Sequence, residues 1–321
     1  MKKGKRKMNT KTKVLSTALA LAVSASITAL PASAASKTAE RDFAATYSAE
    51  GESRASTRWE RFLTLSSVSN KSVWSYARKS VTVGGKVLSV GSITVNGTDY
   101  IPSRLAATAL GLSYSYNSST RSVTVKGSGL EFTFSDGCYV AYANGRALFS
   151  TTPCVIMSDG RMYIPKEMFA KATGLSASSS ESSVSFTGSY KPLVSADKFY
   201  RADEVFWLAR IIHAESNGEP LLGQIAVGNV VLNRVKSAYY PNTIYGVIFD
   251  RKYGVQFSPV LDGSIYNTPS YLSTLAAKIC LEGYDVSDGT FFFLRPEMST
   301  SSWIPNNRIY AFSIGKHDFY Y

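Results

Sequence analysis

The chain has 321 residues, 45% of them hydrophobic, and a net charge of +12 that arises from 35 basic and 23 acidic residues. This length allows two domains, each with a core of its own. Seven of the basic residues lie among the first 13, and residues 191–321 carry 12 basic and 12 acidic residues, so no concentrated basic surface remains for a nucleic acid. The modest basic excess of the middle of the chain suits either an anionic polymer or an ordinary solvated surface.

Residues 1–35 predict a secretion signal. Their basic residues precede an apolar run from Val14 to Leu30, which ends at Ala32-Ser33-Ala34, a typical cleavage site. We expect an exported protein with no stable membrane span after cleavage. A retained membrane anchor is the alternative, although a run so rich in small residues is marginal for spanning. The Ser, Ala and Thr of residues 36–80 predict a linker or a loosely ordered arm.

Residues 81–190 change to the period of two that is typical of strands, and they contain a repeat. Tyr100-Ile101-Pro102 returns as Tyr163-Ile164-Pro165, an offset of 163 − 100 = 63 residues, and Ala109–Leu112 returns at the same offset as Ala172–Leu175. Each unit predicts a turn (Asn96-Gly97 or Asp159-Gly160), a strand, a short helix and closing strands.

This duplicated pattern resembles the copper amine oxidase N-terminal-like domain of exported proteins. The resemblance implies a small α/β module for attachment or spacing at a cell wall, and a purely structural spacer is the alternative. The segment contains no histidine, so it lacks the usual ligands of copper, and we expect neither oxidase activity nor a cofactor.

The three cysteines are Cys138, Cys154 and Cys280. In an exported protein, Cys138 and Cys154 are candidates for a disulfide, and two buried free thiols are the alternative. Only two histidines exist, His213 and His317, which is too few for a zinc amidase or peptidase, so no metal is expected. Cys280 lies in an apolar helical pattern and is better explained as a buried residue than as a nucleophile.

Residues 191–321 open with two predicted helices. Apolar residues at helical spacing give the first one, Asn217-Gly218 predicts a left-handed stop, and Pro220 fits the start of a second helix that reaches Lys236. Glu215 lies in the last turn of the first helix, where the negative end of the helix dipole should raise its pKa. A carboxylic acid protonated near neutral pH can act as a general acid. An ordinary solvent-facing Glu is the alternative.

The remaining elements, in chain order, are a short helix at 244–249, an extended segment at 253–259, a helix at 269–281, a strand at 290–294 and a closing segment at 306–319. Together with the two helices they resemble the cell wall hydrolase family of spore cortex-lytic enzymes (the SleB and CwlJ type). The matching segments are Ala214–Pro220, Gly223–Val227, Val231–Val235, Pro241–Ile244, Gly246–Ile248, Gln256–Val260, Asp262-Gly263 and Gly315–His317.

The resemblance implies an α+β, lysozyme-like, mainly helical catalytic domain with a small β-hairpin at residues 191–321. It also implies that Glu215, the first Glu of the A-E-x-x-G-E motif, is the catalytic acid of a lytic transglycosylase. Such an enzyme cleaves the bond between N-acetylmuramic acid and N-acetylglucosamine in peptidoglycan and leaves a 1,6-anhydro end. The expected location is the cell wall or the secreted fraction, with the spore cortex or inner spore compartments and an accessory spore protein as further candidates.

One acid suffices for a transglycosylase, because the sugar's own 6-hydroxyl attacks. A muramidase or glucosaminidase that uses water is the alternative, and it needs a second carboxylate about 5 Å or about 6.5–9.5 Å away. Glu219 and Asp262 are the candidates, although we interpret Glu219 as a helix-starting acid and Asp262 as a turn residue.

A non-catalytic wall-binding or sporulation protein is the third interpretation. Candidate substrate-binding residues are Glu219, Tyr253, Gln256, Ser258, Phe292 and Trp303. The sequence leaves open whether the substrate is spore cortex or vegetative wall.

Overall fold

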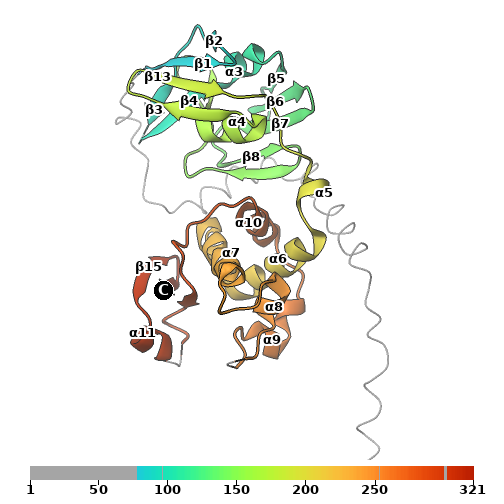
Figure 1. Ribbon diagram of the computed structural model, residues 1–321, viewed down its shortest axis with the longest axis vertical. Helices are drawn as coiled ribbons and strands as arrows, with labels where there is room; N and C mark the ends of the chain where they lie inside the picture. Colours follow the sequence, from blue (N-terminus) through green and yellow to red (C-terminus); the bar gives the residue numbers. More distant parts are fainter. Residues whose placement is uncertain (1–77, 96, 253, 300–301) are drawn as a thin grey trace, which may run out of the picture.

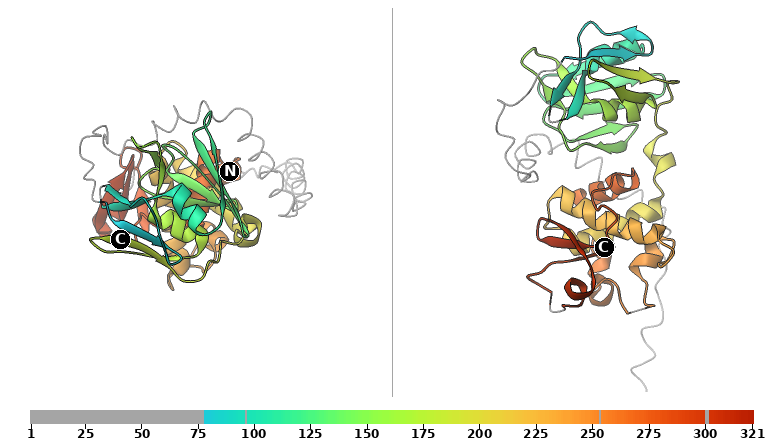
Figure 2. Two further views of the ribbon diagram at one scale, coloured as in Figure 1. Left: turned by 90° about the horizontal axis from the view of Figure 1, so that it is seen from above. Right: turned by 60° about the vertical axis from the view of Figure 1, so that its left-hand side comes forward.

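The computed structural model describes residues 78–321 except 96, 253 and 300–301. A strand-rich module lies at one end of the molecule and a mainly helical domain at the other, joined on one side by a short connecting helix (Figures 1 and 2). The expected α+β fold class is confirmed. The predicted secretion signal and nearly all of the predicted linker lie outside the described residues.

The module contains three sheets and two short helices. The sheet orders are β12-β13-β1-β2, β10-β11-β4-β3 and β5-β6-β7-β8-β9, and β1 pairs in parallel with β13, so that the first and last strands close the module. The elements are β1 Ser80–Val83, β2 Lys86–Val87, β3 Ile93–Val95, β4 Thr98–Pro102, α3 Ser103–Ala109, β5 Ser113–Asn117, β6 Ser122–Gly127, β7 Leu130–Ser135, β8 Val140–Ala143, β9 Arg146–Phe149, β10 Val155–Ile156, β11 Met162–Pro165, α4 Lys166–Thr173, β12 Ser176–Ser179 and β13 Ser183–Thr187.

The two copies of the repeat pair with each other. Strands β4 and β11 run antiparallel, and the register places Ile101 opposite Ile164, with each Tyr opposite the other copy's Pro. Both isoleucines are fully buried, because each continues its strand into the module core. A helix follows each strand directly, α3 after Pro102 and α4 after Pro165. The duplication is therefore folded about a local two-fold axis between the two Tyr-Ile-Pro segments.

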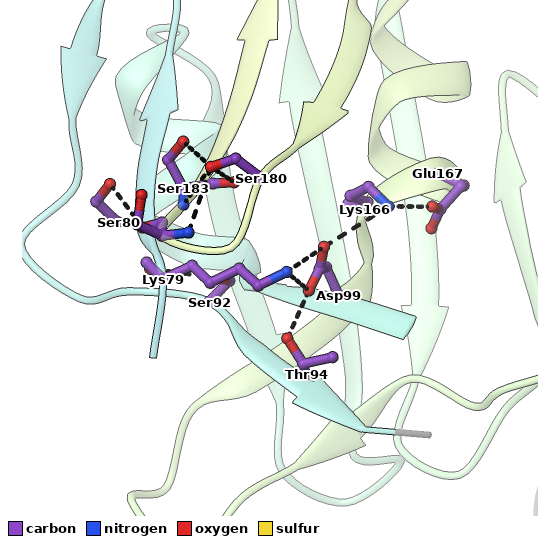
Figure 3. A network of polar contacts seen from close by, with 10 residues as sticks. Lys79, Ser80, Ser92, Thr94, Asp99, Lys166, Glu167, Ser180 and Ser183 are labelled. Atoms are coloured by element: carbon purple, nitrogen blue, oxygen red, sulfur yellow. Dashed lines mark hydrogen bonds and ion pairs between the residues drawn. The ribbon is translucent and has the colours of Figure 1, made fainter. Parts of the chain in front are cut away.

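A buried carboxylate links the edges of the two copies. Asp99 on β4 is only 3% exposed, and Figure 3 shows the groups around it. Thr94 Oγ1 donates to it over 2.6 Å, Lys79 Nζ lies 3.0 Å away, and Lys166 Nζ, at the start of α4, lies 3.8 Å away. Because a buried charge is tolerated only when it is paired and hydrogen-bonded, this cluster fixes the start of β1 and the start of α4 around β4.

Cys138 and Cys154 are neighbours, but the disulfide suggested by the sequence is not formed in the structure. Their main chains are hydrogen-bonded, with the Cys154 N–H donating to the Cys138 carbonyl over 2.9 Å, and both thiols are free. The Cys154 thiol points into the apolar core, where its sulfur lies 4.0 Å from the sulfur of Met168. Both thiols are thus free as in the alternative, but only Cys154 is buried, whereas Cys138 is half-buried.

Three packed helices form the centre of the C-terminal domain, and a three-stranded sheet of order β14-β16-β15 covers one side. At Gly228 in α7, a Cβ would lie 2.8 Å from Cys280 of α10 and 2.8 Å from Ile212 of α6, so the missing side chain allows the close approach of all three helices. The elements are α5 Ala196–Phe199, α6 Ala202–Ser216, α7 Leu221–Lys236, α8 Ile244–Ile248, α9 Pro259–Asp262, the 3-10 turn η2 Ser264–Tyr266, α10 Tyr271–Leu281, β14 Phe292–Leu294, α11 Trp303–Asn307, β15 Tyr310–Ile314 and β16 His317–Tyr320.

The break between α6 and α7 differs from the predicted left-handed stop. Asn217 has a right-handed backbone with φ of −56°, and Gly218 does not have a positive φ. The last turn is completed in another way, because the Glu219 N–H donates to the Ser216 carbonyl over 2.9 Å. Pro220 is the N-cap of α7 and lies just outside the helix that it was expected to begin.

Within the described part of the chain, no helix has the length and apolar character that a membrane crossing requires.

Candidate active site

Glu215 lies in the last turn of α6, where its side chain is half-buried. Burial raises the pKa of its carboxyl to about 7, the negative charge of Asp262 contributes to the rise, and the positive charge of Arg234 opposes it. The direction of the pKa shift is the one expected from the sequence. Burial is the largest cause of this pKa shift, so the packing of α6 against its neighbours controls it. A carboxyl with this pKa can hold a proton near neutral pH and release it.

Asp262 is the acidic neighbour of Glu215. It ends α9, and its carboxylate accepts a hydrogen bond of 2.8 Å from the Ser264 N–H, as the interpretation of this residue as a turn former expects. The contacts with Ser264 lower the pKa of Asp262. The negative charge of Asp262 thus acts on the carboxyl of Glu215.

Glu219 has a different role from the predicted one. Its side chain is buried, and Oε2 accepts a hydrogen bond of 2.8 Å from the Lys316 N–H, in the turn between β15 and β16. Helix α7 has no side-chain cap, so the interpretation of Glu219 as a capping acid is wrong. Because α7 begins only at Leu221, the Glu219 side chain is free to reach across to this turn. It therefore holds the sheet against the helices.

Arg234 was missed as a member of the site. Its guanidinium is buried among the rings of Tyr240, Phe257 and Phe292, at 5.2, 5.1 and 5.5 Å from the ring centroids. Nε donates to the Phe291 carbonyl over 2.9 Å, whereas the buried Nη1 has no hydrogen-bond partner among the described residues. Such a cation is unfavourable unless nearby negative charge compensates it.

Two other polar residues of α7 are structural and hold the segment that follows α10. Asn229 bridges the main chain of Tyr284 and Val286, and Asn233 donates to the Thr290 carbonyl over 3.0 Å. The polar residues that interrupt the apolar face of α7 were the available signal for Arg234, but that signal does not separate a helix tie from a group that acts on Glu215.

Two of the predicted substrate-binding residues come together beside Arg234. The rings of Phe292 on β14 and Trp303 on α11 have centroids 6.3 Å apart, and Trp303 is 51% exposed. The Arg308 guanidinium lies 4.3 Å from the centroid of Phe292 and 5.1 Å from that of Trp303. An exposed indole next to a guanidinium offers a flat apolar face and hydrogen-bond donors, both of which suit a sugar ring.

The segment before α9 holds the other candidates. Gln256 Nε2 donates to the Gly254 carbonyl over 3.1 Å, and Ser258 is exposed at the start of α9. Between them, Phe257 is buried against Arg234, which fixes the segment at the same cluster. Tyr253 lies outside the described residues.

Both histidines have structural contacts. His213 Nδ1 accepts a hydrogen bond of 3.2 Å from the Ser270 N–H and so joins the end of α6 to the start of α10. His317 is buried, with Nδ1 3.9 Å from Glu219 Oε1, and burial lowers its pKa. In the part of the chain that the structure describes, no three His, Cys, Asp or Glu side chains form a group that could hold a metal ion.

A mainly helical domain with one half-buried acid, a nearby carboxylate and exposed aromatic rings has the features of a glycan-cleaving domain. Comparison with known families places it more closely: residues 218–320 match the Cell Wall Hydrolase family, and residues 82–187 match the Copper amine oxidase N-terminal domain. Residues 218–320 of the C-terminal domain are thus similar to a cell wall hydrolase domain, and both predicted family resemblances are confirmed. The histidine-free module does not offer the usual ligands of copper.

Curated relatives share the C-terminal domain. The spore cortex-lytic enzyme of Bacillus cereus is 40% identical over 120 residues, which are 37% of this chain and 45% of the relative. That of Bacillus subtilis is 36% identical over 117 residues, 36% of this chain and 37% of the relative. The chain thus spans less than half the length of these relatives. A solved structure, the catalytic domain of the germination-specific lytic transglycosylase SleB from Bacillus anthracis, is 39% identical and covers 38% of this chain and 97% of that chain, with a TM-score of 0.35.

Proposed function

We propose that this protein is an exported lytic transglycosylase that cleaves peptidoglycan glycan strands with Glu215 as its single acid and base. The observation that carries the proposal is the half-buried carboxyl of Glu215, whose pKa of about 7 suits proton donation at neutral pH. The match of residues 218–320 to the Cell Wall Hydrolase family supports a wall polymer as the substrate.

The proposed reaction needs two proton transfers. Glu215 first donates its proton to the glycosidic oxygen, so the bond to the leaving N-acetylglucosamine breaks as positive charge develops on the muramic acid ring. The Glu215 carboxylate then accepts the proton of the 6-hydroxyl of that ring, and this oxygen closes the 1,6-anhydro bond. Arg234 stabilises the carboxylate that exists between the two steps, because its positive charge acts on Glu215.

A water-using glycosidase is the second candidate, and Asp262 is the observation that favours it. The pKa of Asp262 is lowered, and its negative charge acts on Glu215, so its carboxylate is available as the base that activates a water molecule. Glu219 is a poorer candidate for this task, because its carboxylate holds the turn before His317. In this alternative the products carry reducing ends.

The relatives' names place them in spore cortex breakdown, and we extend this to the present chain as a proposal. The substrate would be cortex peptidoglycan during germination, with vegetative wall as the alternative. We expect the module to bind the cell wall, with anionic wall polymers as candidate partners. An accessory spore protein is a further candidate partner.

The test is the release of fragments from purified peptidoglycan by the wild type and by Glu215→Gln. The matched control is Glu204→Gln, which removes a surface carboxylate from the first turn of the same helix. We expect Glu215→Gln to lose cleavage by at least about a hundredfold, the usual contribution of a general acid, and the control to retain it. Cleavage by Glu215→Gln at the wild-type rate would contradict the assignment.

A further inference from the structure

The module contributes side chains to the core of the C-terminal domain. Strand β9, at the edge of its sheet, packs against α10. Val140 on β8 and Ala147 on β9 are buried in one apolar cluster with Leu208 of α6 and Leu275 of α10. The partly buried ring of Phe149 extends this contact and packs edge-on against Tyr284, with ring centroids 4.7 Å apart. The two domains therefore share a continuous apolar interface.

A buried carboxylate also joins the two domains. Glu282 follows α10 directly, and its side chain is 2% exposed. Arg146 on β9 donates two parallel hydrogen bonds of 2.8 Å to the two carboxylate oxygens. Lys171 at the end of α4 lies 3.1 Å from Oε2, and the Tyr200 hydroxyl donates to Oε1 over 2.7 Å. All four groups come from segments that are far apart in the sequence.

The connecting segment is held by the same cluster. The guanidinium of Arg146 lies 3.3 Å from the ring centroid of Phe199 in α5, and the Ala147 N–H donates to the Tyr200 hydroxyl over 3.1 Å. A flexible tether would make no such fixed contacts. Although α5 itself has no buried residue, the Tyr200 hydroxyl joins the connecting segment to both domains.

The two kinds of contact have different effects. Removal of apolar surface from water provides the stabilising free energy, whereas a buried ion pair adds little because its desolvation opposes its attraction. The paired hydrogen bonds of a guanidinium and a carboxylate require one mutual orientation, so they select a single angle between the domains. The side chains that contact the Glu282 carboxylate among the described residues, Arg146, Lys171 and Tyr200, all lie in the module and the connecting segment.

We propose that the module and the C-terminal domain form one rigid unit that unfolds cooperatively, in which the module supports α10 and the contacts of Arg146 with Glu282 set the angle between the two. The module is then a fixed support for the helices that carry the site, and not a spacer that moves independently. This proposal does not depend on the reaction that the C-terminal domain catalyses.

Calorimetry and small-angle scattering of the full chain test the proposal. The wild type should unfold in a single transition whose calorimetric and van't Hoff enthalpies agree. Glu282→Lys places a positive charge against Arg146 and Lys171 and should give two transitions and a larger radius of gyration. The matched control is Glu131→Lys, which breaks an exposed pair with Lys126 inside the module and should leave one transition.

Two separate transitions in the wild type would overturn the proposal, and so would a single transition and an unchanged radius of gyration in Glu282→Lys. If Glu282→Lys does not fold, Glu282→Gln serves instead, because it keeps the shape of the side chain and removes only its charge. A broader distribution of interatomic distances in Glu282→Gln supports the proposal, and a distribution identical to that of the wild type contradicts it.

Discussion

Replacement of Glu215 by Gln should stabilise the protein at high pH and leave its stability unchanged at low pH. The folded state raises the pKa of this carboxyl from 4.5 to about 7. Below pH 4.5 the group is protonated in both the folded and unfolded states, and its ionisation has no effect on folding. As the pH rises through this window the unfolded state ionises first, so the folded state loses stability relative to it.

The size of the effect follows from the pKa shift. A change of about 2.5 pKa units corresponds to at most about 3.5 kcal/mol in the free energy of unfolding above pH 7, since one unit is about 1.4 kcal/mol. The neutral amide of Glu215→Gln avoids this loss. Because all other titrating groups are common to both proteins, the difference between their unfolding curves isolates Glu215.

The assay is urea unfolding of the wild type and Glu215→Gln at several values between pH 4 and pH 8. We expect the two free energies of unfolding to agree near pH 4 and to diverge by up to about 3.5 kcal/mol near pH 8, with the variant more stable. Glu204→Gln is the control, because it measures how the loss of a surface carboxylate from the same helix changes the free energy of unfolding. Parallel curves for the wild type and Glu215→Gln would refute the raised pKa and with it the physical basis for Glu215 as an acid.

Three further substitutions test the surroundings of the site. Arg234→Met removes the charge that lowers the pKa of Glu215, so the alkaline limb of the pH profile of kcat/KM should move to higher pH. An unmoved limb would show that Arg234 does not act on Glu215. Gly315→Ala should destabilise the protein by about 1–3 kcal/mol in urea unfolding, because φ is +60° and a Cβ would meet Glu219, which the β15–β16 turn needs. Gly228→Ala should also destabilise the protein by about 1–3 kcal/mol, because its Cβ would lie 2.8 Å from side chains of α6 and α10. For either glycine variant, an unchanged midpoint of thermal unfolding would contradict the close packing.

The local features of the fold were predictable because they depend on short-range patterns. The Tyr-Ile-Pro repeat predicted a strand followed by a short helix in each copy, and the structure has β4 and β11 end at Pro102 and Pro165, with α3 and α4 directly after them. The repeat did not indicate that its copies pair with each other. The pairing of Ile101 with Ile164 is a contact across 63 residues (164 − 101), and no periodicity within either copy specifies such a contact.

In the candidate site, too, local features were predictable from the sequence and long-range contacts were not. Glu215 was found because its position at a helix end and the motif around it are both local features. Glu219 was misread because its partner, the Lys316 main chain, lies 97 residues further along the chain. Arg234 was missed since its effect depends on three rings from separate elements, which only the folded chain brings together.

Mass analysis of the fragments released from purified cortex peptidoglycan tests the central claim most directly. The account predicts that the wild type produces fragments ending in 1,6-anhydro-muramic acid, which are lighter by one water than hydrolysis products, and that Glu215→Gln produces none. A parallel digest of vegetative wall compares the two substrates. Fragments with reducing ends would replace the transglycosylase by a water-using glycosidase, and anhydro fragments from Glu215→Gln would contradict the role of Glu215.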